Sequence, residues 1–264
     1  MTPVLMLGAG RLGGALIEGW GRFGGPAGTD LLILDPAPSE AALFASRMGA
    51  LLSPGPADLA RAGTVVLSVK PQIWREVAAT VSHKLAPDAV IVSVAAGVRA
   101  ADISAAFGGR RVARVMPTTA VAVGRGVASL FATDAEAGRR AADLFRPVAT
   151  VVSLAEEDLL HAATGVSGSA PAYFYAFVEA LEAAGVAAGL PQDASRNLAR
   201  ATMIGAAALL DASGEEPAEL RRQVTSPKGT TEAALEVLMG EGGLGPLLEA
   251  AVAAAAQRSR ELGG

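Results

Sequence analysis

The chain has 264 residues, a formal net charge of −4 and no cysteine. This length allows two domains of ordinary size. The acidic balance lacks the basic stripe of a nucleic-acid-binding protein, and the missing cysteine excludes disulfides, thiolate catalysis and thiolate metal sites. We therefore expect neither nucleic acid nor an anionic membrane as a partner, and a reducing cytoplasm is compatible with this composition.

The first part of the chain alternates short apolar runs with helix patterns such as residues 13–20 and 57–62. Runs this continuous and rich in β-branched residues are typical of a parallel sheet that helices cover on both faces. They predict strands at residues 4–7, 31–34, 65–69, 90–94, 111–115, 126–131 and 150–154. We predict a Rossmann-type, doubly wound α/β domain over residues 1–154.

The strand patterns end near residue 154, and the remainder predicts an all-α domain over residues 155–264. Its helices are expected at residues 156–163, 170–187, 192–212, 217–224, 230–239 and 244–262. The longest charge-free run, residues 159–178, contains Gly165 and Pro171 and is not expected to span a membrane. Alanine-rich helices of this kind leave apolar faces on a lone subunit, so we predict a homodimer or a larger assembly. The aromatic residues of 173–177 are expected to pack in the core or between subunits.

A glycine motif directly follows the first predicted strand. Gly8 permits a tight turn, Gly10 lets a pyrophosphate approach the backbone, and Gly13 allows close contact between helix and strand. Strand, motif and helix occur in the required order, which predicts an NAD(P)H site. The motif residues are Gly8, Ala9, Gly10, Arg11, Leu12 and Gly13.

Asp35 ends the second predicted strand, close to the distance from the glycines at which a ribose-binding acid is expected. A carboxylate there accepts hydrogen bonds from the ribose hydroxyls and repels a 2′-phosphate, so Asp35 favours NADH over NADPH. The alternative is that Asp35 only opens a turn before Pro36.

Two later strands end at the same predicted edge of the sheet. Lys70 follows one of them, and Ala95, Ala96 and Gly97 follow the other. Ligands of open α/β sheets bind at the carboxyl ends of the strands, so these residues are expected to face the cofactor or substrate. From position alone, Lys70 is equally well explained as a solvated surface lysine.

Residues 224–231, Val-Thr-Ser-Pro-Lys-Gly-Thr-Thr, lead into a good helix pattern. Hydroxyls, a glycine and the free N–H groups of a helix start can together bind an anion. An ordinary capped helix explains the same pattern, because capping alone favours Thr before a helix and an acid such as Glu232 in its first turn. This segment alone leaves both interpretations open.

Several blocks of sequence occur in an order that invites comparison with known families. They are Gly8-Ala9-Gly10, Val69-Lys70-Pro71, Ala95-Ala96-Gly97, Met116-Pro117, residues 164–173 (Thr-Gly-Val-Ser-Gly-Ser-Ala-Pro-Ala-Tyr) and Thr225-Ser226-Pro227 with Gly229-Thr230-Thr231. In these blocks the chain resembles the pyrroline-5-carboxylate reductase family over nearly its whole length. The last two blocks are the specific ones, because related dehydrogenases share the first block without the final segment.

The resemblance implies reduction of 1-pyrroline-5-carboxylate to L-proline with NAD(P)H, the last step of proline biosynthesis, by a dimer with intertwined helical domains. It also implies that Thr231 hydrogen-bonds the ring nitrogen. The other substrate residues would be Ser226, Gly229 and Thr230, and the cofactor would be lined by Val69, Lys70, Pro71, Ala95, Ala96 and Gly97.

The chain departs from the family pattern at three positions. Thr118 replaces an asparagine expected near the nicotinamide, which puts that contact in doubt. Lys228 replaces the first glycine of the usual pair and either adds a positive charge near a carboxylate or points into solvent. Ala170 replaces a glycine in the helical block, which is a mild change.

Neither histidine lies in a cofactor or substrate motif, so structural roles are expected for His83 and His161, and no metal site is predicted. A pyrroline nitrogen can be protonated before hydride arrives, so Thr231 is expected to orient the substrate rather than to act as an acid. Two alternatives remain. One is a related dehydrogenase acting on a hydroxy acid or another imino acid, and the other is a dinucleotide-binding regulator without catalysis. Such a dehydrogenase generally needs a Lys or His in the helical domain, where only Lys228 and His161 occur between residues 155 and 243.

Overall fold

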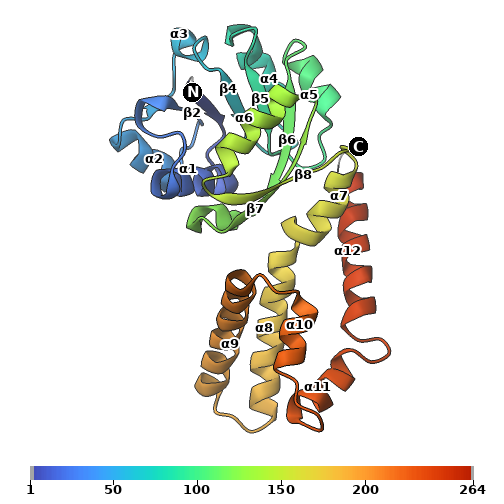
Figure 1. The fold of residues 1–264 in the computed structure, drawn as a ribbon. Helices are drawn as coiled ribbons and strands as arrows, with labels where there is room; N and C mark the ends of the chain where they lie inside the picture. The colour runs from blue at the N-terminus through green and yellow to red at the C-terminus, as the bar shows by residue number, and fades with distance from the viewer. Residues whose placement is uncertain (1–2, 263–264) are drawn as a thin grey trace. The chain divides into compact units, whose positions relative to one another are not determined.

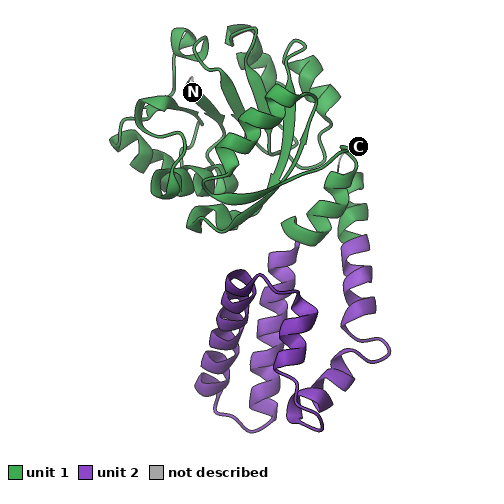
Figure 2. Cartoon of the chain, in the orientation of Figure 1, with its two compact units in different colours: residues 1–168, 254–264 green, residues 169–253 purple. Residues whose placement is uncertain are grey.

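The computed structural model describes residues 3–262 and divides the chain into two compact units (Figure 2). Unit 1 comprises the residues up to 168 together with those from 254 onward, and unit 2 comprises Ser169–Ala253. The packing therefore divides the chain after the first helix that follows residue 154. The predicted functional boundary at residue 154 stays a prediction.

Unit 1 is built on one eight-stranded sheet (Figure 1). Its order is β3-β2-β1-β4-β5-β6-β7-β8, whose first six strands have the Rossmann arrangement. This confirms the predicted fold class. The strands are β1 (Val4–Leu7), β2 (Leu31–Leu34), β3 (Leu51–Leu52), β4 (Thr64–Leu67), β5 (Val90–Ser93), β6 (Val112–Pro117), β7 (Gly126–Ala132) and β8 (Ala149–Ser153).

The sheet departs from a fully parallel arrangement at one edge. Strand β7 pairs antiparallel with β6, so that Val115 lies opposite Leu130, and β8 then runs parallel to β7. Only residues 118–125, which include the 3-10 helix η3 (Thr119–Val123), connect β6 to β7. A parallel crossover needs a dozen or more residues, so this short connection requires the chain to reverse.

Helices cover both faces of the sheet and create two separate cores. On one face, α1 (Arg11–Phe23), α2 (Glu40–Arg47) and α6 (Ala135–Phe145) bury residues such as Trp20 and Phe145. On the other, α3 (Pro56–Leu59), α4 (Trp74–Val81) and α5 (Ala100–Ala106) bury Trp74 and Ile103. Every residue of β1, β4 and β5 is buried, as expected for strands covered on both faces.

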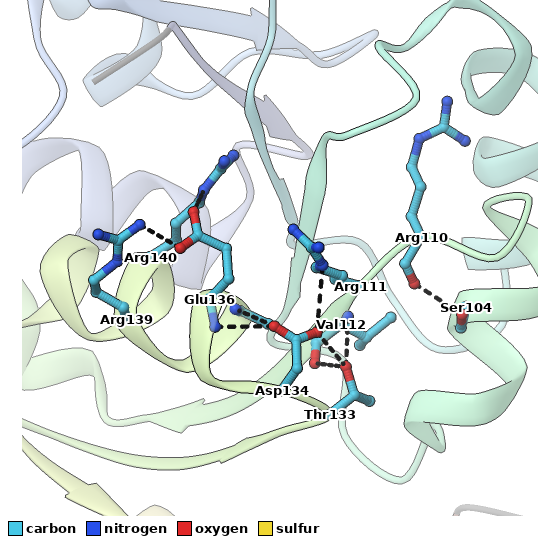
Figure 3. A network of polar contacts seen from close by, with 10 residues as sticks. Ser104, Arg110, Arg111, Val112, Thr133, Asp134, Glu136, Arg139 and Arg140 are labelled. Carbon is cyan, nitrogen blue, oxygen red and sulfur yellow. Dashed lines mark hydrogen bonds and ion pairs between the residues drawn. The ribbon is translucent and has the colours of Figure 1, made fainter.

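A polar network fixes the amino end of β6 to the start of α6 (Figure 3). Asp134 caps α6 by accepting hydrogen bonds from the backbone N–H groups of Glu136 and Ala137 at 2.9 and 3.0 Å. Its other carboxylate oxygen lies 3.7 Å from Arg111 Nε. Next to it, Thr133 Oγ1 accepts from the Val112 backbone N–H at 3.1 Å. The network lies at the amino ends of the parallel strands, on the opposite side of the sheet from their carboxyl ends.

Unit 1 is completed by α7 (Leu159–Ala163), a π-helix at Thr164–Gly168 and the end of α12 (Leu244–Glu261). His161 is only 9% exposed, and its Nδ1 lies 2.9 Å from Ser259 Oγ. Burial lowers the pKa of His161, and the nearby guanidinium groups of Arg114 and Arg260 lower it further. His161 thus packs α7 against α12, whereas His83 is exposed.

Unit 2 contains α8 (Ala170–Ala187), α9 (Gln192–Ser213), α10 (Pro217–Gln223), α11 (Thr230–Leu238) and the first part of α12. Helices α8 and α9 approach closely at Gly185, where an added methyl group would lie 2.1 Å from Ser195 Oγ. Many apolar side chains of the unit remain outside any core: Tyr175 is 72% exposed and Ile204 71%. Of the aromatic residues expected in the core or between subunits, Phe174, Tyr175 and Phe177 are exposed in the single chain, so packing between subunits stays a prediction for them. Within residues 3–262, no helix combines the length and apolarity needed to cross a membrane.

Candidate functional site

The predicted cofactor residues meet at the carboxyl edge of the sheet. Apart from Asp35 at the end of β2, they follow β1, β4 and β5, and these three strands are neighbours. The register places Leu7 beside Leu67 and Leu67 beside Ser93, so the three loops leave the sheet at one level. This edge is where open α/β sheets bind their ligands.

The glycine loop, called the glycine cradle below, is closely packed at Gly8 and Gly13 and open at Gly10. Gly8 has φ +89°, and a Cβ there would lie 2.6 Å from the Ser68 carbonyl oxygen. A Cβ on Gly13 would lie 2.4 Å from the Gly8 carbonyl oxygen, whereas Gly10 opens onto free space. Gly10 is the N-cap of α1 and has no side chain to cap it, while Arg11 and Leu12 form the first turn. The backbone N–H groups of this turn can therefore bind a pyrophosphate, as the motif predicts.

Asp35 lies at the end of β2 and contacts the glycine loop. Its Oδ2 accepts a hydrogen bond from the Ala9 backbone N–H at 2.5 Å, and its Oδ1 accepts one from the Ala37 N–H at 2.7 Å. The second bond is the turn that the alternative interpretation expects, and the first places the carboxylate beside the dinucleotide motif. Asp35 therefore forms the turn and also contacts the glycine loop, while its role in ribose binding stays a prediction.

The loop after β4 is open to solvent, and the loop after β5 is mostly buried. Lys70 is exposed, and its ammonium has no ion-pair partner within residues 3–262, while Val69 and Pro71 are half-buried. In the second loop Ala95 and Gly97 are buried, Ala96 is half-buried, and Gly97 has φ +77°. Polar contacts at the two ends of the second loop, from Ser93 and Glu157, were not anticipated from the sequence.

The segment that contains Ser226 lies in unit 2 and begins α11. Helix α11 starts at Thr230 with Gly229 as its N-cap, so no threonine side chain caps it. The Glu232 carboxylate instead accepts a hydrogen bond from the Lys228 backbone N–H at 2.6 Å. In the described part of the chain, the hydroxyls of Thr230 and Thr231 make no hydrogen bond, which leaves both able to contact a ligand. All predicted substrate residues thus belong to unit 2, and all predicted cofactor residues belong to unit 1.

Comparison with known proteins identifies the family. A family model described as pyrroline-5-carboxylate reductase dimerisation matches residues 157–262, and one described as NADP oxidoreductase, coenzyme F420-dependent, matches residues 3–97. The pyrroline-5-carboxylate reductase of Pisum sativum is 38% identical over 260 residues, which cover 97% of this chain and 94% of that protein. The Pseudomonas aeruginosa enzyme of the same name is 38% identical over 267 residues, covering 99% and 97%. The chain belongs to the pyrroline-5-carboxylate reductase family.

A solved structure of a pyrroline-5-carboxylate reductase supports the same conclusion. The enzyme from Coxiella burnetii superposes with a TM-score of 0.90 at 28% identity, over 100% of this chain and 99% of that one. The Plasmodium falciparum enzyme, solved with NADP bound, gives a TM-score of 0.83 at 24% identity and so supports the fold.

The structure shows the surroundings of the three positions that depart from the family pattern. Lys228 has φ +59°, a left-handed conformation that favours glycine, which explains why glycine is the usual residue there. Thr118 is buried, and its Oγ1 accepts a hydrogen bond from the Val127 N–H at 3.1 Å. Its side chain therefore already has a partner in the β6–β7 pair. Ala170 is buried at the start of α8 and fits there without strain.

Proposed function

We propose that this protein reduces 1-pyrroline-5-carboxylate to L-proline with NAD(P)H, as the last step of proline biosynthesis. The observation that carries the proposal is the open glycine cradle at the uncapped start of α1, in a chain that belongs to this reductase family. The cradle supports dinucleotide binding on physical grounds, and family membership supports the choice of substrate.

The cofactor would be held by the backbone N–H groups that follow Gly10 and by the loops 69–71 and 95–97. When bound, the reduced nicotinamide supplies the hydride. We further propose that Asp35 makes NADH the preferred form, because its carboxylate lies beside Ala9 and would repel a 2′-phosphate. The chain's own contribution is to fix the position of the nicotinamide ring, since proximity and orientation provide much of the rate in such a reaction.

The substrate would be bound by the segment from Ser226 to Thr231. Backbone N–H groups at the start of α11 and the hydroxyl of Thr230 would bind the carboxylate, while Gly229 lets the ligand approach the backbone. The Thr231 hydroxyl would orient the ring nitrogen by accepting a hydrogen bond from the N–H of the protonated imine. No residue need supply a strong acid, because the imine can carry its own proton.

We propose that the functional protein is a homodimer or an assembly of dimers. The support is the match to the dimerisation family together with the exposed apolar side chains of α8 and α9, such as Tyr175 and Ile204. A second copy would remove these side chains from water. A cytoplasmic location and the absence of nucleic-acid partners stay predictions from composition.

Mixing the purified protein with NADH and pyrroline-5-carboxylate tests the function directly. Loss of nicotinamide absorbance that depends on the imine, with proline as product, is the expected result. A protein that binds NADH but oxidises neither NADH nor NADPH with this imine would refute the proposed reaction and favour a regulator. Turnover with a hydroxy acid and NAD⁺, but not with the imine, would favour a related dehydrogenase.

A further inference from the structure

The loop between β5 and α5 is held at both ends by polar side chains. At its start, the Ala95 backbone N–H donates to Ser93 Oγ at 3.2 Å. At its end, the N–H of Ala100, the first residue of α5, donates to Glu157 Oε1 at 2.6 Å. Glu157 is 57 positions further along the chain, so α5 is capped by a residue from outside its own segment.

A buried arginine connects the two fixed ends. Arg114, on β6, is only 3% exposed, and its Nη1 donates to the same Glu157 oxygen at 2.8 Å. Arg114 is also the cross-strand neighbour of Ser93. The residue that fixes the start of the loop and the residue that fixes Glu157 are therefore adjacent in the sheet.

The charge of Arg114 is costly to bury. A buried guanidinium is stabilised only by a partner with good geometry, and removal of that partner leaves an uncompensated charge. Arg114 Nε is itself buried without a hydrogen-bond partner in the described part of the chain, so the pairing with Glu157 is the contact that compensates the charge. Glu157 also pairs with Arg99, the residue before Ala100, at 3.9 Å, so it holds the end of the loop through two contacts.

We propose that Glu157 is a positioning residue for cofactor binding. Anchored by Arg114, it fixes the end of the loop that contains Ala95, Ala96 and Gly97 in the form that receives the dinucleotide. The inference rests on the proposed function for the assignment of this loop to the cofactor. It adds a residue that lies outside every recognised motif and acts through the Ala100 N–H and Arg99.

The test compares Glu157→Ala and Glu157→Gln with Glu156→Ala, a change at the exposed neighbour. NADH affinity is measured by nicotinamide fluorescence at a temperature where circular dichroism shows each variant to be folded. We expect the NADH Kd to rise on the order of tenfold for Glu157→Ala, because a charged hydrogen bond is lost. Glu157→Gln keeps an oxygen that can accept a hydrogen bond from the Ala100 N–H, so its NADH Kd should rise only about threefold. The NADH Kd of Glu156→Ala should equal that of the parent.

In the Glu157 variants, turnover at saturating NADH should change by less than about twofold. The proposed role of Glu157 is to hold the loop in the shape that binds the cofactor, and the loop itself takes no part in the chemical step. A purely structural role would lower the melting temperature without changing the Kd, and that result would overturn the proposal. If Glu157→Ala does not fold, Glu157→Gln decides, and a Kd equal to that of the parent overturns the proposal. If the parent protein binds NADH but does not reduce the imine, the proposed function is refuted, while the NADH Kd values still test the role of Glu157.

Discussion

Replacement of Asp35 by asparagine should move cofactor preference from NADH toward NADPH. The side chain keeps its size and one oxygen for the Ala9 or Ala37 N–H, but it loses the negative charge beside the glycine loop. At a separation of about 5 Å and an effective dielectric constant of about 40, two unit charges repel by about 1.7 kcal/mol, or roughly 20-fold in affinity.

Asparagine also accepts hydrogen bonds from ribose hydroxyls less well than a carboxylate, which costs NADH about 1 kcal/mol, or roughly fivefold. The ratio of kcat/KM for NADPH to that for NADH should therefore rise by about 100-fold at low ionic strength. The electrostatic part should shrink as salt is added, because Asp35 is only half-buried.

The assay is steady-state kinetics with each cofactor at two salt concentrations, with Asp30→Asn as the control. Asp30 is an exposed carboxylate that precedes β2, at the opposite end of the strand. A ratio within twofold of the parent for Asp35→Asn would refute the reasoning. A parent that already prefers NADPH would do the same.

Three further outcomes are expected. Thr231→Ala should lower kcat/KM for the imine by about tenfold or more, with NADH affinity unchanged in a fluorescence titration, because it removes one hydrogen bond to a charged ring; unchanged turnover would exclude Thr231 from the site. Lys228→Gly should stabilise the protein by about 1 kcal/mol in urea unfolding, since it relieves a left-handed residue and removes a cation near a helix N-terminus; a loss of stability would contradict this. The parent should lose stability as the pH falls below the ordinary histidine value, because the lowered pKa of His161 lets the unfolded chain bind the proton first. His161→Gln should weaken that pH dependence of the melting temperature and His83→Gln should not; equal effects would refute the assignment to the buried histidine.

Much of the fold follows from local sequence patterns. The predicted strand at residues 126–131 is β7 (Gly126–Ala132), and the helix predicted at 170–187 is α8, because long apolar runs and Gly or Pro breaks are strong local signals. The sequence does not predict strand β3, because two residues, one exposed and one half-buried, are too few to show the alternating pattern of a strand. The direction of β7 was also missed, although the short connection after Pro117 excludes a parallel crossover.

The candidate site divides in the same way. The glycines of the cradle can be predicted from the sequence, because glycine is the residue that readily adopts a positive φ and allows another backbone to approach closely, as at Gly8. Glu157 could not be found from the sequence, because its role depends on a contact with Ala100 across 57 positions. A charged residue in an apolar strand, as Arg114 is in β6, was the one signal that could have suggested a buried partner.

The position of α12 has a consequence for the order in which the protein is made. Unit 1 contains the first 168 residues and also the residues from 254 onward, including Ser259, the partner of His161. During synthesis the sheet can form while the helices of unit 2 are still being added, but α7 lacks its partner until the end of α12 leaves the ribosome. The unit that begins to fold first is therefore also the last to be completed.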